Sequence, residues 1–162
     1  MLKYSETEIV FREVPDEVSL AINITNCPHR CVGCHSPHLW NDIGEPLTAD
    51  AIDEMLKDPK TGPVSCIAFM GGDADMEELF ILNQEVKSRH PELKTCWYTG
   101  WDYSCREFLD ISHRIYEFDY VKIGPYIPEK GPIDKDGSNQ VMFKRIGDGL
   151  MENITTRFRK TI

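Results

Sequence analysis

The feature that most constrains this chain is a group of three cysteines, Cys27, Cys31 and Cys34, in the spacing C-x3-C-x2-C. The group directly follows an apolar run at residues 18–24, which predicts a buried strand. Three thiols so close together cannot all pair in disulfides, so the spacing indicates that they converge on a metal centre. Thiolate sulfur is a soft ligand that binds Zn, Cu(I) and the iron of iron–sulfur clusters.

The spacing of the cysteines narrows the choice of metal. A structural Zn site usually takes four ligands from two separated C-x-x-C pairs, and this chain has no second pair. His29 or His35 could supply a fourth ligand, but ligands one or two residues apart seldom point at the same ion. Three cysteines can instead hold three irons of a 4Fe-4S cluster and leave the fourth iron open to another ligand. We therefore favour an iron–sulfur cluster and keep a Zn-binding module as an alternative.

Length and composition predict one acidic domain. A chain of 162 residues, 41% of them hydrophobic, is long enough to bury a core of its own. The net charge of −9 argues against a nucleic-acid partner, since proteins that bind phosphate backbones present a basic face. No apolar run is long enough to span a membrane, and residues 1–6 contain no apolar signal region. We expect a cytoplasmic protein with reduced thiols and no membrane association.

Strands and helices alternate along the chain, which predicts βαβ units and a parallel sheet. Four such units are too few for a closed eight-stranded barrel, so we expect an α/β fold in a single domain, an open partial (βα) barrel with a mostly parallel sheet. The core would span residues 18–143, with a C-terminal extension at 144–162. The expected elements are strands at 8–11 (an edge strand), 18–24, 64–70, 95–98, 120–123 and 140–143, helices at 48–57, 75–89 and 104–116, and a long ordered loop at 124–139.

Glycine turns follow two further predicted strands. Gly71-Gly72-Asp73 comes after the strand at 64–70, and Thr99-Gly100-Trp101 comes after the strand at 95–98. Because functional sites lie at the carboxyl ends of parallel strands, we expect both turns to meet the cysteines around one mouth. Taken alone, Gly-Gly favours an ordinary strand-to-helix turn, and the cysteine motif beside it reverses that preference.

Taken together, these motifs resemble the radical S-adenosylmethionine superfamily, and within it the activating proteins of anaerobic (class III) ribonucleotide reductase. The resemblance begins at the cysteine motif, with Gly33 before its last cysteine, and continues to Gly124-Pro125 and residues 137–140. It implies a partial barrel of the radical S-adenosylmethionine type that holds a 4Fe-4S cluster with an open fourth iron. The implied site residues are the metal ligands Cys27, Cys31 and Cys34 and the S-adenosylmethionine-binding residues Gly71, Gly72, Asp73, Ser138 and Asn139.

The resemblance also implies an activity. The reduced cluster would cleave S-adenosylmethionine, and the resulting radical would form a glycyl radical on the catalytic subunit of anaerobic ribonucleoside-triphosphate reductase. A low-potential protein such as flavodoxin or ferredoxin would donate the electron, and no side chain is expected to act as a catalytic residue. The chain departs from the family pattern at Ala74-Asp75 and at Lys122-Ile123. The alternatives are an activase of another glycyl-radical enzyme, a radical enzyme acting on a small molecule, and a non-catalytic iron–sulfur or Zn module.

The other conspicuous side chains have ordinary explanations. Cys66 and Cys96 lie in apolar strands and are expected to be buried small hydrophobes, and Cys105 is assigned no role. Trp97 and Trp101 are expected to pack in the core. Exposure to solvent is expected for the three histidines near the cysteines, His29, His35 and His38.

Overall fold

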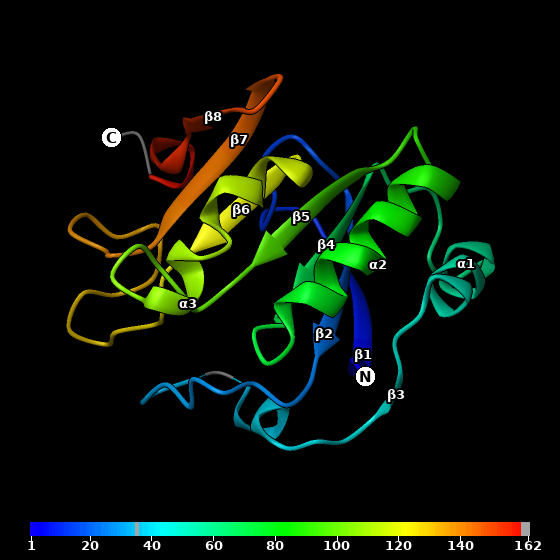
Figure 1. Ribbon diagram of the computed structural model, residues 1–162, viewed down its shortest axis with the longest axis horizontal. Helices are drawn as coiled ribbons and strands as arrows, with labels where there is room; N and C mark the ends of the chain where they lie inside the picture. The colour runs from blue at the N-terminus through cyan, green and yellow to red at the C-terminus, as the bar shows by residue number, and fades with distance from the viewer. Residues whose placement is uncertain (35, 160–162) are drawn as a thin grey trace.

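A computed structural model describes residues 1–34 and 36–159, and its centre is an eight-stranded sheet (Figure 1). The strands follow the order β3-β1-β2-β4-β5-β6-β7-β8. They are β1 (Lys3–Val10), β2 (Ser19–Ile24), β3 (Glu45–Pro46), β4 (Cys66–Met70), β5 (Lys94–Tyr98), β6 (Tyr120–Ile123), β7 (Val141–Gly147) and β8 (Leu150–Asn153). The helices are α1 (Ala49–Lys57), α2 (Met76–Arg89) and α3 (Arg106–Leu109), and the 3-10 turns are η1 (Pro37–Trp40), η2 (Ser112–Glu117) and η3 (Thr155–Phe158).

The sheet confirms the α/β class but is mixed rather than mostly parallel. Strands β2, β4, β5 and β6 are parallel neighbours, as the alternating pattern predicted. Antiparallel strands flank them on both sides, with β1 and β3 beyond β2, and β7 and β8 beyond β6. Short connections without a crossover helix permit only antiparallel pairing, and such connections join β1 to β2 and β7 to β8.

The first strand differs most from its prediction. The expected edge strand at 8–11 is β1, which runs over residues 3–10 and lies inside the sheet between β2 and β3. Phe11, which was expected in the strand, lies outside it and is 69% exposed. The polar segment at residues 5–8 concealed the strand, because its side chains are mostly exposed and backbone hydrogen bonds to β2 pair it with the sheet.

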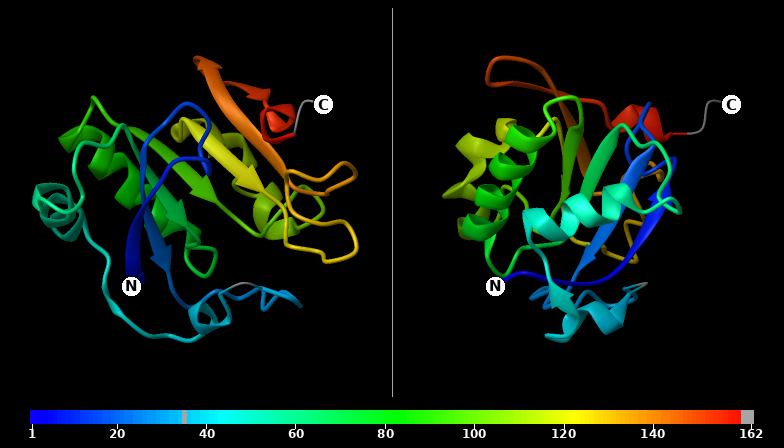
Figure 2. Two further views of the ribbon diagram at one scale, coloured as in Figure 1. Left: turned by 180° about the vertical axis from the view of Figure 1, so that it is seen from behind. Right: turned by 90° about the vertical axis from the view of Figure 1, so that its right-hand side faces the viewer.

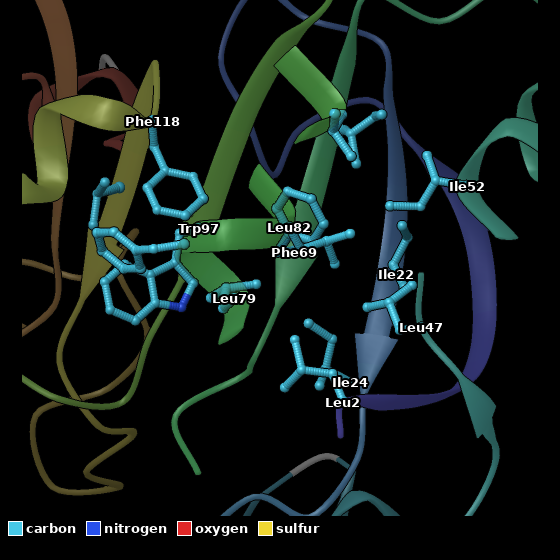
Figure 3. Packing of buried hydrophobic residues seen from close by; sticks show 14 of the residues in the cluster. Leu2, Ile22, Ile24, Leu47, Ile52, Phe69, Leu79, Leu82, Trp97 and Phe118 are labelled. Atoms are coloured by element: carbon cyan, nitrogen blue, oxygen red, sulfur yellow. The ribbon is translucent and has the colours of Figure 1, made fainter. Parts of the chain in front are cut away.

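Alternate residues of the parallel strands face two different layers. One face packs against α1, α2, α3 and η2, and Figures 2 and 3 show these helices on one side of the sheet and the apolar side chains beneath them. The opposite face carries a smaller apolar cluster that includes Cys66, Cys96 and Tyr120, and η3 lies on that side (Figure 2). Both cysteines are fully buried, as predicted, and Trp97 lies in the larger core with no exposed surface.

Two of the three predicted helices are confirmed with their caps. The Thr48 side chain accepts a hydrogen bond from the backbone N–H of Ala51 at the start of α1, and Asp75 does the same for Glu78 at the start of α2. The helix predicted at 104–116 is wrong as one element, because α3 ends at Leu109 and η2 follows. At this break the Ser112 hydroxyl donates to the Leu109 carbonyl, which in a continuous helix would accept from a backbone N–H group. No helix of the described residues is long and apolar enough to cross a membrane.

The region after β6 matches its prediction in part. Residues 124–139 form a loop without helix or strand, as expected. β7 begins at Val141 but continues to Gly147, beyond the predicted end at residue 143. It then turns through Gly149, with φ of +68°, into β8, which the sequence did not predict.

One partly buried carboxylate, that of Asp119, connects α2, β5 and β7 beside β6. Lys87 Nζ lies 2.5 Å from Asp119 Oδ2, Arg145 donates to Oδ1 at 2.6 Å, and the Thr95 N–H donates to Oδ2 at 2.9 Å. Burial alone would raise the pKa of Asp119, but the hydrogen bonds and the nearby cations together hold that pKa below its usual value. Asp119 therefore contributes to stability mainly as an ionised group.

Candidate metal and cofactor site

The carboxyl ends of the parallel strands surround a cavity of about 190 Å³. The loop after β2, light blue at the bottom of Figure 1, contributes all three cysteines of the motif. The turns after β4, β5 and β6 form the rest of the wall, so the structure brings together the loops that the sequence placed at one mouth. The residues that these loops contribute include Cys27, Cys31, Cys34, Gly71, Asp73, Thr99, Gly100, Gly124 and Pro125.

The backbone of the cysteine loop donates hydrogen bonds to the sulfur of its first cysteine, Cys27. Burial raises the pKa of Cys27, and hydrogen bonds from the backbone N–H groups of His29 and Arg30 to the sulfur offset part of that effect. Arg30 adopts a φ of +48° and Gly33 a φ of +76°, so the chain twice enters the left-handed region between the cysteines. The Ser36 N–H donates to the Cys34 sulfur at 3.4 Å. Backbone donors thus reach the sulfurs of Cys27 and Cys34, and at Cys27 they offset only part of the effect of burial.

The turn after β4 requires glycine at both of its first positions. Gly71 has φ of +118°, and an added Cβ would lie 3.2 Å from the Ile24 carbonyl oxygen. Gly72 has φ of +97°, and an added Cβ would lie 2.9 Å from a methyl carbon of Leu79. The indole N–H of Trp97 donates to the Gly71 carbonyl at 3.0 Å from inside the core. Gly71 therefore faces the cavity, whereas Gly72 provides the close contact between the turn and α2.

Asp73 ends this turn and is only 3% exposed. Its Oδ2 atom lies 2.5 Å from His29 Nε2 and accepts a second hydrogen bond from the Gly100 N–H at 2.8 Å. Its Oδ1 atom is buried and accepts no hydrogen bond from any described residue. The expectation that His29 is solvated is wrong, because its side chain is 10% exposed and packs against Trp101.

The other histidines near the cysteines differ from His29. His38 is exposed, as expected, and its Nε2 atom lies 2.9 Å from Glu6 at the surface. His35 lies outside the described residues. Trp101 is partly buried against the core, as predicted. The sequence contained one clue to the buried histidine, since His29 lies two residues after a predicted metal ligand in a loop that ends a strand.

Lys122 lies in the wall of the cavity, although the sequence did not predict it as a site residue. Burial lowers the pKa of Lys122 to about 8, and its ammonium group lies 4.6 Å from the ring centroid of Tyr98. The Tyr98 hydroxyl donates to the Glu13 carbonyl, which fixes this ring. The available signal in the sequence was a lysine within the otherwise apolar strand at 120–123. Lys122 places positive charge near the cysteines.

Ser138 and Asn139 are not part of the cavity wall. The Ser138 hydroxyl donates to the Gly131 carbonyl at 3.0 Å, and the Asn139 amide donates to the Pro125 carbonyl at 2.9 Å. Pro125 itself lines the cavity. These two side chains therefore support the loop at 124–139, and Asn139 supports the part of it that borders the site.

The residues present fit an iron–sulfur cluster and a cationic ligand. The three cysteines are free, partly accessible thiols around one cavity, and soft sulfur is the usual ligand of such clusters. Among residues 1–34 and 36–159, no three His, Cys, Asp or Glu side chains lie close enough together to hold one metal ion, whereas the three cysteines of a 4Fe-4S cluster would each bind a different iron. The buried Oδ1 atom of Asp73 accepts no hydrogen bond from the described residues, and an ammonium group bound in the cavity would donate one.

Comparisons with known proteins agree with this chemistry. The model of the 4Fe-4S single cluster domain family matches residues 18–135, which include the cysteine loop and the turn at 71–73. The chain is also 28% identical over 85 residues to the anaerobic ribonucleoside-triphosphate reductase-activating protein of Enterobacteria phage T4. That match covers 49% of this chain and 54% of the relative, so it spans about half of each. No solved structure matches the chain. The resemblance found in the motifs is thereby confirmed, and the chain belongs to the 4Fe-4S single cluster domain family.

Proposed function

We propose that this chain is a radical S-adenosylmethionine activase that generates a glycyl radical on anaerobic ribonucleoside-triphosphate reductase. The observation that carries the proposal is one cavity lined by three free cysteines and by the Gly-Gly-Asp turn. The phage T4 relative supports the choice of partner, because its name describes the activation of that reductase. The acidic charge of the chain suits a protein substrate better than a nucleic acid.

In this proposal, Cys27, Cys31 and Cys34 hold a 4Fe-4S cluster whose fourth iron has no protein ligand. When bound, the cluster and S-adenosylmethionine supply reductive cleavage of the cofactor, which provides the radical that removes a hydrogen atom from a glycine of the partner. The chain itself contributes the ligands, the orientation of the cofactor and a shielded cavity. A flavodoxin or ferredoxin in the cytoplasm would supply the electron.

The turn after β4 would bind the methionyl end of the cofactor. Gly71 allows the cofactor to approach the backbone, and the hydrogen bond from Trp97 fixes its carbonyl group. Asp73 would accept a hydrogen bond from the ammonium group through Oδ1, and Gly72 keeps the turn seated on α2. Asn139 would act on the cofactor through Pro125, and Ser138 through the same loop.

The small size of the cavity supports a protein substrate. We propose that residues 1–162 form one radical S-adenosylmethionine domain, an open partial barrel whose cavity lies at the mouth of the parallel strands. The cavity of about 190 Å³ is shallow for a cofactor of this size, so a docked partner would complete the enclosure and exclude water.

Anaerobic reconstitution provides the test. The protein is loaded with iron and sulfide, reduced with dithionite and mixed with S-adenosylmethionine, and 5′-deoxyadenosine is measured with and without the reductase. We expect cleavage by the wild-type protein and loss of cleavage and cluster in Cys31→Ala. The matched control is Cys105→Ala, which removes a free, partly buried cysteine that does not line the cavity.

The outcomes separate the alternatives. Cleavage together with a glycyl radical on the reductase, seen by electron paramagnetic resonance, would support the full proposal. Cleavage without that radical would exclude this partner and leave another glycyl-radical enzyme or a small molecule as substrate. A bound cluster or Zn without any cleavage would refute the enzyme and leave a non-catalytic metal-binding module.

A further inference from the structure

His29 and Asp73 join the cysteine loop to the Gly-Gly-Asp turn. His29 Nε2 lies 2.5 Å from Asp73 Oδ2, and the two side chains are 10% and 3% exposed. A carboxylate oxygen accepts hydrogen bonds, so we describe this contact as one that the ring N–H of His29 donates to Asp73. Hydrogen bonds to a charged acceptor are stronger than neutral ones, which makes this contact a firm link between two loops distant in sequence.

The two oxygens of Asp73 have different surroundings. Oδ2 accepts hydrogen bonds from His29 and from the Gly100 N–H, whereas Oδ1 is buried and receives none from the described residues. A buried carboxylate oxygen without a donor is costly, so the arrangement is completed when a bound molecule supplies that donor. Because Asp73 lines the cavity together with the cysteines, the donor is expected to come from a molecule bound there.

Packing holds the His29 ring in this position. The ring meets Trp101 edge to face, with centroids 4.4 Å apart. Gly100 lies so close that an added Cβ would be 2.6 Å from Cδ2 of the ring. The Trp101 indole N–H also donates to the Asp73 carbonyl at 3.4 Å. The ring therefore has little room to turn away, and the Asp73 carboxylate keeps one orientation.

We infer that His29 is a positioning residue: it holds Oδ2 of Asp73 so that Oδ1 accepts a hydrogen bond from the ammonium group of the bound cofactor. The inference rests on the proposed function, which supplies S-adenosylmethionine as the ligand. His29 itself lines the cavity, but this role requires neither contact with the cofactor nor a place among the metal ligands. It also explains why the cysteine loop carries a largely buried histidine whose ring contacts a carboxylate.

The test compares two nucleosides that differ in the ammonium group alone. S-adenosylhomocysteine carries this group, and its desamino analogue, 4-(5′-adenosylthio)butanoate, keeps the carboxylate and lacks the ammonium. Anaerobic calorimetric titration of the cluster-loaded protein gives the ratio of the two dissociation constants. We expect His29→Leu to reduce this preference by about tenfold. His29→Gln should keep it within about threefold, because its amide nitrogen can donate from nearly the same position as Nε2.

Two further variants make the test specific. Gly100→Ala should reduce the preference as His29→Leu does, because the added Cβ displaces the ring without removing it. This variant keeps the test decisive if His29→Leu loses its cluster, which an iron assay on every variant would show. His38→Leu is the matched control, because His38 bonds a carboxylate at the surface and is 49% exposed. Its preference should equal that of the wild type.

A wild-type preference in both His29→Leu and Gly100→Ala would overturn the inference. Equal losses in His29→Leu and His29→Gln would also overturn it, since they would show that the packing of the ring matters and its proton does not. If the cluster-loaded wild-type protein binds neither nucleoside, the proposed function fails and the inference fails with it. Binding with an unchanged preference in the variants refutes the inference alone.

Discussion

Replacing Gly72 with alanine should destabilise the protein more than the same change at a glycine in open space. Gly72 has φ of +97°, and an added Cβ would lie 2.9 Å from Leu79, whose side chain is fully buried. A left-handed backbone costs an L-residue about 1–2 kcal/mol, and overpacking a core adds about 1–3 kcal/mol. We therefore expect Gly72→Ala to lower the free energy of unfolding by about 2–5 kcal/mol.

Gly62 provides the matched control. Its φ is +66°, and no atom lies within 4 Å of the position that a Cβ would take. Gly62→Ala therefore carries only the backbone cost of about 1–2 kcal/mol. Urea unfolding followed by tryptophan fluorescence, with all proteins in the same cluster state, measures both losses. Equal losses would refute the reasoning, because they would show that Leu79 moves aside without cost.

Three further predictions concern side chains on or beside the parallel strands. The free energy of unfolding should fall as the pH drops below about 4, because the lowered pKa of Asp119 in the folded state means that the unfolded chain binds the proton first. In urea-unfolding experiments, Asp119→Asn should make stability depend less on pH in this range. An unchanged pH dependence would contradict the role of the carboxylate. Burial raises the pKa of Cys66 to about 12 and that of Cys96 well above its usual value, so iodoacetamide at pH 8 should label neither in the folded protein, as mass spectrometry of peptides would show. Trp97→Phe leaves the Gly71 carbonyl without its donor and should cost about 1–3 kcal/mol in the same urea assay, whereas a loss below about 0.5 kcal/mol would argue against this hydrogen bond.

The parallel strands were predictable because burial on both faces leaves a continuous apolar run in the sequence. β2 and β4 show this pattern, with at most one residue of each strand not fully buried. β1 and β8 lack it, since β1 has one buried residue and β8 has none, and backbone pairing to β2 and β7 places them in the sheet. Turn chemistry predicted the caps of α1 and α2, but the break after α3 depends on one hydroxyl at Ser112 and gave no periodic signal.

The candidate site shows the same division between local and distant information. The spacing of Cys27, Cys31 and Cys34 is local and was sufficient to place them in one loop, while the α/β pattern predicted which turns would meet that loop. The burial of His29 depends on Gly100, which belongs to a different strand-end turn. Gly100 has no positive φ, so the turn itself does not require glycine there, and the absence of a Cβ serves the approach of the His29 ring instead. A glycine at the carboxyl end of a strand can therefore mark the place where a side chain from another loop must fit, and at this site that side chain is the one that orients Asp73.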